Sequence, residues 1–161
     1  MTTELPQPDK TKLKGSKHAR ATMARLAAVQ CVYQWLYTRD PAAAIIDRYF
    51  ADYAGEKLEE ETGDELLVPD RELLMQIVSQ VETELQALEE RIASHLNSSV
   101  DRQKDLLIQS ILLCGTAELT GPSELDPPII IADYLHVTRA FYEGSEIKLI
   151  NGVLDQIYKT S

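Results

Sequence analysis

Apolar residues recur at helical spacing along nearly the whole chain, and no window keeps the alternating pattern of a strand for long. The first helical segment, which follows a basic stretch, has two apolar faces. Its larger face carries Leu26, Val29, Tyr33 and Leu36, and its smaller face carries Ala24, Ala28, Cys31 and Trp35. A helix that is apolar on both sides must be covered on both sides. We therefore expect it to lie at the centre of a bundle or to be half-covered by a partner.

Capping residues mark the next two helical segments. Asp40-Pro41 predicts a helix start, because Asp caps free amides and Pro loses no hydrogen bond in the first turn. Gly55 predicts the end of that helix, and the acidic residues 56–64 predict an exposed loop. Pro69-Asp70 opens a helical region that runs to about Leu96. Its length predicts a break into two helices, although neither Gly nor Pro marks the position.

The second half of the chain begins at Asn97-Ser98-Ser99, a group of capping residues. The segment from Leu106 to Leu119 is apolar almost all round, which is typical of the most buried helix of a domain. Gly121-Pro122 predicts its end.

Two more helices complete the pattern. Asp126-Pro127 predicts the start of a helix over Ile129–Phe141, and Gly144 predicts the end of that helix. Ser145 is predicted to cap a last helix. Gly152 lies inside that last helix, where glycine costs about 1 kcal/mol relative to alanine. We expect another helix to approach its backbone closely. The pattern as a whole predicts an all-α fold of six or seven helices in one domain.

The charge is unevenly distributed. Residues 1–25 hold six Lys/Arg and two acidic residues, a net charge of +4, whereas the other 136 residues hold 10 basic and 24 acidic residues, a net charge of −14. Such asymmetry indicates either a basic arm that seeks a polyanion or a solvated tail that aids solubility.

Candidate enzyme chemistry is sparse. The histidines are scattered without metal-ligand spacing, and the glycines are too isolated to form a phosphate-binding loop. Cys31 and Cys114 each lie in an apolar helical pattern, which favours two buried thiols in a reducing compartment. The apolar runs are too short to span a bilayer, and the N-terminus does not resemble a secretory signal. The sequence therefore predicts a cytoplasmic binding protein with no metal, no cofactor and no membrane association.

Four segments resemble the NusB family of transcription antitermination proteins. The string NGVLD at Asn151–Asp155 is similar to the closing motif of that family, and Ala24-Arg25 followed by AAVQCVYQWLY is similar to its opening helix. The segments ILLCGTAEL (Ile111–Leu119) and IIIADYLHVTRAF (Ile129–Phe141) are similar to its buried and penultimate helices. The resemblance covers nearly the whole chain after residue 16.

The resemblance implies two small helical bundles, about residues 16–96 and 97–161, behind a flexible basic arm over residues 1–15. It also implies a heterodimer with the small-subunit ribosomal protein that doubles as the factor NusE. In that family the pair binds single-stranded boxA RNA of nascent ribosomal RNA transcripts, within the antitermination complex of RNA polymerase. On this basis the expected RNA-binding residues are Lys17, His18, Arg20, Arg25, Tyr33 and Lys148. The expected partner-binding residues are Glu118, Asp133 and Leu149.

The chain departs from the family at several of these positions. Ala21-Thr22-Met23 stands where the family has a run of arginines, and Leu149 replaces an aromatic residue. A second hypothesis therefore stands beside the first: an adaptor that binds the ribosomal protein with little RNA affinity of its own. Tyr33 also has two interpretations, as a contact residue or as part of the core.

Overall fold

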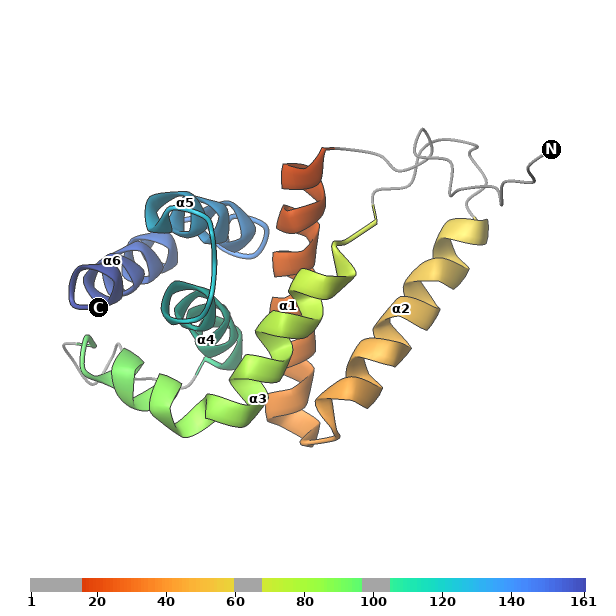
Figure 1. Ribbon diagram of the computed structural model, residues 1–161, viewed down its shortest axis with the longest axis horizontal. Helices are drawn as coiled ribbons and strands as arrows, with labels where there is room; N and C mark the ends of the chain where they lie inside the picture. The colour runs from red at the N-terminus through yellow and green to blue at the C-terminus, as the bar shows by residue number, and fades with distance from the viewer. Residues whose placement is uncertain (1–15, 60–67, 97–104) are drawn as a thin grey trace.

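The computed structural model describes residues 16–59, 68–96 and 105–161, which form six α-helices and no strand (Figure 1). The helices are α1 (Lys17–Thr38), α2 (Ala42–Glu59), α3 (Arg71–Ala93), α4 (Leu106–Thr120), α5 (Pro127–Thr138) and α6 (Ser145–Lys159). The all-α prediction is confirmed. None of these helices has the length and apolar character needed to cross a bilayer.

Helix α1 runs through the middle of the molecule. Helix α2 lies on one side of it and α4, α5 and α6 lie on the other, while α3 crosses α1 and reaches α4 and α6 (Figure 1). The central position explains the smaller apolar face of α1, all of whose residues are buried. On the larger face only Val29 is buried, while Leu26 and Leu36 are half-buried and Tyr33 is exposed. The expectation that this helix lies at the centre of a bundle is confirmed.

Local side-chain caps mark three of the six described helix starts. Ser16, Asp70 and Asp105 each accept a backbone amide hydrogen bond in the first turn of α1, α3 and α4. At the start of α2 the amide of Ala42 donates instead to Glu82 Oε2 of α3, at 3.1 Å. This amide is therefore satisfied across the fold by a residue that local sequence does not indicate.

Three predicted boundaries are wrong. Helix α2 continues through Gly55 to Glu59, so glycine is tolerated there inside the helix. Helix α5 ends at Thr138 and not at Phe141, well before Gly144. Ser145 is the first residue of α6 and not its cap, because Gly144 occupies the N-cap position without a capping side chain. The rest of the predicted acidic loop, residues 60–64, and the capping group at 97–99 lie outside the described residues.

The predicted break in α3 is confirmed. Glu84 departs from helical geometry, with φ −118° and ψ 26°, and the helix axis changes direction (Figure 1). Before the break, the amide of Asp70 donates to the carbonyl of Arg20 at the start of α1. After the break, Arg91 donates to the Ser161 hydroxyl at the C-terminus. The break thus lets one helix contact both halves of the molecule.

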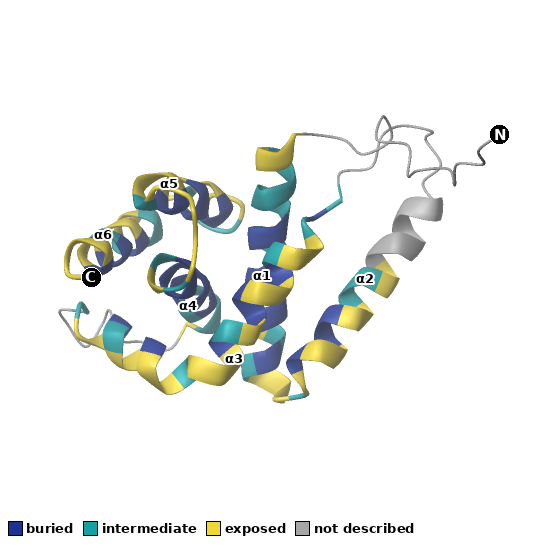
Figure 2. Cartoon of the chain, viewed as in Figure 1, coloured by how far each residue is buried: buried dark blue, intermediate teal, exposed yellow. Residues whose placement is uncertain are grey.

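Helix α4 is the most buried element, as its all-round apolar pattern predicts. Nine consecutive residues, Ser110–Glu118, are buried (Figure 2). Gly115 lies among them, and a Cβ there would meet both terminal methyl groups of Leu154 at 3.0 Å. This is the close helix approach that we expected at Gly152. At Gly152 itself the expectation is wrong, because the residue is exposed and a Cβ would meet nothing within 4 Å.

These two glycines make a matched test of the packing. We predict that Gly152→Ala stabilises the protein by about 1 kcal/mol, because alanine loses less backbone entropy in a helix and meets no neighbour. Gly115→Ala should lack that gain and destabilise the protein, because Leu154 must move in a close-packed core. Urea denaturation monitored by circular dichroism measures both changes. A gain at Gly115 equal to that at Gly152 would contradict the α4–α6 packing.

Candidate RNA and partner interface

The start of α1 carries exposed positive charge. Lys17 and His18 are exposed in the first turn, which Ser16 caps. Arg20 is half-buried, and its Nε donates to the carbonyl of Val68 at 3.0 Å. That bond fixes the side chain across the gap between α1 and the segment before α3. An anion at this end of α1 would meet the exposed Lys17 and the half-buried Arg20 together, near the helix N-terminus that also favours negative charge.

Arg25, one turn further along, lies in the core. Its side chain is 1% exposed, and it forms a bidentate pair with Glu118 of α4. Arg25 Nε lies 2.6 Å from Glu118 Oε1, and a terminal nitrogen lies 2.8 Å from Oε2. The other terminal nitrogen donates to Asp133 Oδ2 of α5 at 2.7 Å. The RNA-binding assignment of Arg25 is therefore wrong, because a buried and fully engaged guanidinium cannot reach a phosphate.

Two hydroxyl groups complete this buried cluster. Tyr134 donates to Glu118 Oε1 at 2.8 Å, and Thr22 donates to Asp133 Oδ1 at 2.7 Å. Burial disfavours the charge of Arg25, but the hydrogen bonds and charge of Glu118 outweigh it and raise the guanidinium pKa above its ordinary value. Burial, and then the charge of Glu118, raises the pKa of Tyr134 well above its ordinary range. The cluster ties α1, α4 and α5 together.

The same cluster corrects two of the partner-binding assignments. Glu118 is 6% exposed and Asp133 is 5% exposed, and the oxygens of both carboxylates accept bonds from within the chain. Neither side chain is presented to a partner. Leu149 is half-buried on α6 and packs against the core, so its partner role stays a prediction. Lys148 beside it is exposed, which is compatible with the phosphate contact predicted for it.

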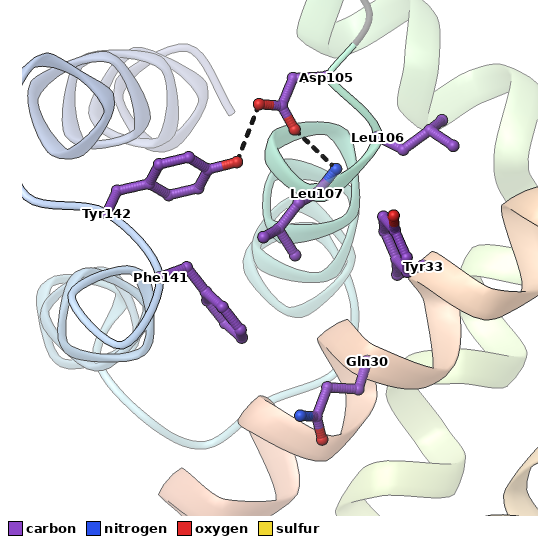
Figure 3. A pocket seen from close by; sticks show the side chains of 7 residues that line it. All are labelled: Gln30, Tyr33, Asp105, Leu106, Leu107, Phe141 and Tyr142. Carbon is purple, nitrogen blue, oxygen red and sulfur yellow. Dashed lines mark hydrogen bonds between the residues drawn. The ribbon is translucent and has the colours of Figure 1, made fainter.

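Tyr33 is 44% exposed, which excludes the core interpretation of this residue. It lines a pocket of about 520 Å³ between α1, the start of α4 and the α5–α6 connection (Figure 3). The other lining residues are Gln30, Asp105, Leu106, Leu107, Phe141 and Tyr142. The pocket lies sixteen residues along α1 from Lys17, or roughly 24 Å at the rise of an α-helix. The structure therefore does not bring Tyr33 together with the cationic end of α1.

Comparison with known proteins decides the family. The model of the NusB family matches residues 22–159. The chain belongs to the NusB family. Among its relatives, the transcription antitermination protein NusB of Rhizobium rhizogenes is 33% identical over 84% of each chain. That of Rhodopseudomonas palustris is 31% identical over 89% of this chain and 85% of the relative.

Solved NusB structures share the fold. A crystal structure of the antitermination factors NusB and NusE in complex with dsRNA superposes with a TM-score of 0.69 and 22% identity, covering 91% of this chain and 100% of that one. The solution structure of NusB from Aquifex aeolicus gives a TM-score of 0.67 and 20% identity, covering 87% and 88%. At this level of identity the likeness establishes the fold of this NusB-family chain and leaves its contacts to be argued from its own residues.

Six of the seven pocket residues were not predicted as site residues from sequence: Gln30, Asp105, Leu106, Leu107, Phe141 and Tyr142. Asp105 precedes the apolar run that begins at Leu106, so the rule for helix caps could have found it. Its carboxylate caps α4 and also accepts the hydroxyl of Tyr142 at 2.9 Å (Figure 3). No local signal joins the others, because they come from elements far apart in the sequence.

Metal and thiol chemistry have no support in the described part of this NusB-family chain. No group of three His, Cys, Asp or Glu side chains there could hold a metal ion. Cys31 and Cys114 are both free and buried. Burial raises the pKa of the Cys31 thiol from its ordinary value of 9.0 to about 12, so neither reactivity nor metal binding is favoured there.

The buried cluster predicts a large effect at one residue. Arg25→Ala should destabilise the protein by about 3–5 kcal/mol, because it leaves Glu118 and Asp133 buried without their cation. Arg25→Lys should recover only part of the loss, since an ammonium cannot form the bidentate pair. Arg71→Ala removes an exposed arginine that stacks over Phe50, and serves as the control with a loss of roughly 1 kcal/mol or less. Urea denaturation measures all three. Equal losses at Arg25 and Arg71 would contradict the role of the cluster.

The buried thiol predicts a loss of stability in alkali. The pKa of Cys31 is raised in the folded state, so the unfolded chain releases this proton first as the pH rises. The contribution of Cys31 is fully present below about pH 9 and is lost up to about pH 12, at a slope of about 1.4 kcal/mol per pH unit. Cys31→Ala should flatten the fall in unfolding free energy by that slope. An unchanged pH profile in the variant would show that Cys31 is not the group that titrates.

Proposed function

We propose that this chain is a transcription antitermination factor that binds boxA-type RNA as a heterodimer with a NusE-type ribosomal protein. Membership of the NusB family supports the antitermination role, and a structural neighbour that holds NusB, NusE and dsRNA supports the two partners. On this proposal the chain works in the cytoplasm by binding and catalyses no reaction.

The observation that carries the RNA role is the exposed cationic start of α1. Lys17 and His18 are exposed, although His18 Nε2 also lies 4.0 Å from Asp133 Oδ1, and Arg20 is half-exposed next to them. The rest of the chain is strongly acidic, with a net charge of −14 beyond residue 25. Because phosphate contacts need accessible cations, RNA is directed to this end of the molecule and repelled from most of the remaining surface.

The burial of Arg25 favours a second candidate, the adaptor with little RNA affinity. With Arg25 in the core, the expected phosphate contacts are reduced to Lys17, His18, Arg20 and Lys148. An adaptor would keep the ribosomal-protein partner, whose basic surface suits the acidic body. The two candidates differ in RNA affinity alone.

A salt series separates them. If Lys17, Arg20 and Lys148 each contact a phosphate, the logarithm of the RNA binding constant should fall against log salt with a slope of about −2 in all, or −0.7 per contact. Lys17→Ala and Lys148→Ala should each flatten the slope by about 0.7 and weaken binding to any RNA sequence, since phosphate contacts position but do not specify. Fluorescence anisotropy with a labelled boxA-type RNA and the partner-bound chain measures both quantities.

Lys159→Ala is the matched control, because Lys159 is an exposed lysine that pairs with Asp155 at the end of α6. It removes the same charge and should leave the slope unchanged. Equal effects of all three lysine variants would show that only net charge matters. Undetectable RNA binding by a chain that still binds the NusE-type protein would establish the adaptor.

A further inference from the structure

The segment of residues 68–70 leads into α3 beside the first turns of α1 (Figure 1). It makes two hydrogen bonds to a single residue of α1. Arg20 Nε donates to the carbonyl of Val68 at 3.0 Å, and the amide of Asp70 donates to the carbonyl of Arg20 at 3.1 Å. One residue of the predicted RNA site is thus held by its side chain and by its backbone from a segment 48 residues further along the chain.

The sequence of this segment restricts its shape. A residue that precedes proline is confined to extended backbone, so Pro69 limits the directions that the carbonyl of Val68 can take. Pro69 itself is buried. Asp70 is the N-cap of α3, and its carboxylate accepts the amide of Leu73 at 3.1 Å. The segment is therefore anchored by the helix cap and stiffened by the proline, which makes the Val68 carbonyl a fixed acceptor for Arg20.

The guanidinium of Arg20 keeps most of its donors for a ligand. It has five N–H groups, and Val68 engages only the one on Nε. Among the described residues, no other bond of this side chain is made. All three nitrogens of Arg25, by contrast, are engaged by carboxylates. Arg20 therefore presents two terminal nitrogens in one plane, a fork that fits two oxygens of a phosphate.

Holding this side chain in advance lowers the cost of binding. An exposed lysine such as Lys17 loses rotamer freedom when it contacts a phosphate. Arg20 has already lost much of that freedom on folding, because the bond to Val68 fixes its guanidinium. A contact of Arg20 with phosphate should thus contribute more affinity than its charge alone provides.

We propose that residues 68–70 belong to the RNA site, where they hold Arg20 as a preformed fork for one phosphate. Pro69 is then a positioning residue that acts through Arg20. The ligand rests on the proposed function, whereas the held guanidinium is a property of the chain alone. Because the same segment caps α3, RNA binding and the order of the first turn of α3 are linked.

Arg20→Lys tests the fork, since it keeps the charge and removes the planar set of donors. In titrations of the full chain with a boxA-type RNA, the binding constant should fall at least about five-fold, while the salt slope changes by less than about 0.2. Arg48→Lys, at an exposed arginine of α2, is the matched control and should leave both quantities unchanged. Equal affinities of Arg20→Lys and the parent chain overturn the proposal.

Pro69→Ala tests the positioning without altering any charge. It frees the backbone of residues 68–70, so RNA affinity should fall at least about three-fold. In the Arg20→Lys background the same change should leave RNA affinity unaltered, because the positioning acts only through the guanidinium. Urea denaturation should show a similar loss of stability in both backgrounds. An equal loss of RNA affinity in both backgrounds, or in neither, overturns the positioning role.

The held side chain is tested without RNA by NMR of the arginine Nε–Hε groups. In the parent chain Hε of Arg20 should exchange with solvent at least about ten-fold more slowly than Hε of Arg48, because only the former is bonded to a carbonyl. Titration with inorganic phosphate should shift the Arg20 signal, with saturation on the order of tens of millimolar. Pro69→Ala should abolish the slow exchange and weaken the shift.

The outcomes separate this proposal from the proposed function. Fast exchange of Arg20 Hε, or phosphate shifts equal at Arg20 and Arg48, overturns the preformed fork whatever the chain does with RNA. Absence of RNA binding by the parent chain, with Arg20 Hε protected and shifted by phosphate, refutes the proposed function and leaves the phosphate fork established.

Discussion

The bidentate ion pair between Arg25 and Glu118 is the interaction on which the rest of the structure depends. It joins the central helix α1 to the most buried helix α4, and the third contact of Arg25, to Asp133, adds α5. Such a pair gains little net free energy over an apolar one, but its rupture leaves charges without water or partner. The fold is therefore held in one register, since sliding α1 along α4 would separate both contacts at once.

That arrangement also determines where charge is available for binding. Because Arg25 is buried, only the first turn of α1 and the more distant Lys148 offer the exposed cations predicted for RNA. Thirteen residues beyond Arg20 on the same helix, Tyr33 lines a pocket whose charged lining residue is Asp105. A single helix thus presents different electrostatic environments near its two ends, and the proposed RNA contact falls at the cationic one.

Much of the fold could be predicted from sequence because its signals are local. The periodicity of α1 and α4, the caps at Asp70 and Asp126, and the break in α3 all depend on residues close in the chain. The candidate site was less predictable, because its residues meet only in the tertiary structure. From sequence alone Arg25 resembles an exposed cation, because its partner Glu118 lies far along the chain and meets it only in the folded structure. The close helix approach expected at Gly152 is found at Gly115 for the same reason, since helical spacing does not reveal which face meets Leu154.

The location of the RNA site is tested most directly by NMR chemical-shift mapping of the full chain with a boxA-type RNA. RNA should perturb the amides of Lys17, His18 and Arg20 and leave those of Gln30 and Tyr33 unchanged. The amides around Arg25 should also change little, because the buried cluster stays intact. Perturbations centred on Tyr33, with none at the start of α1, would contradict the account.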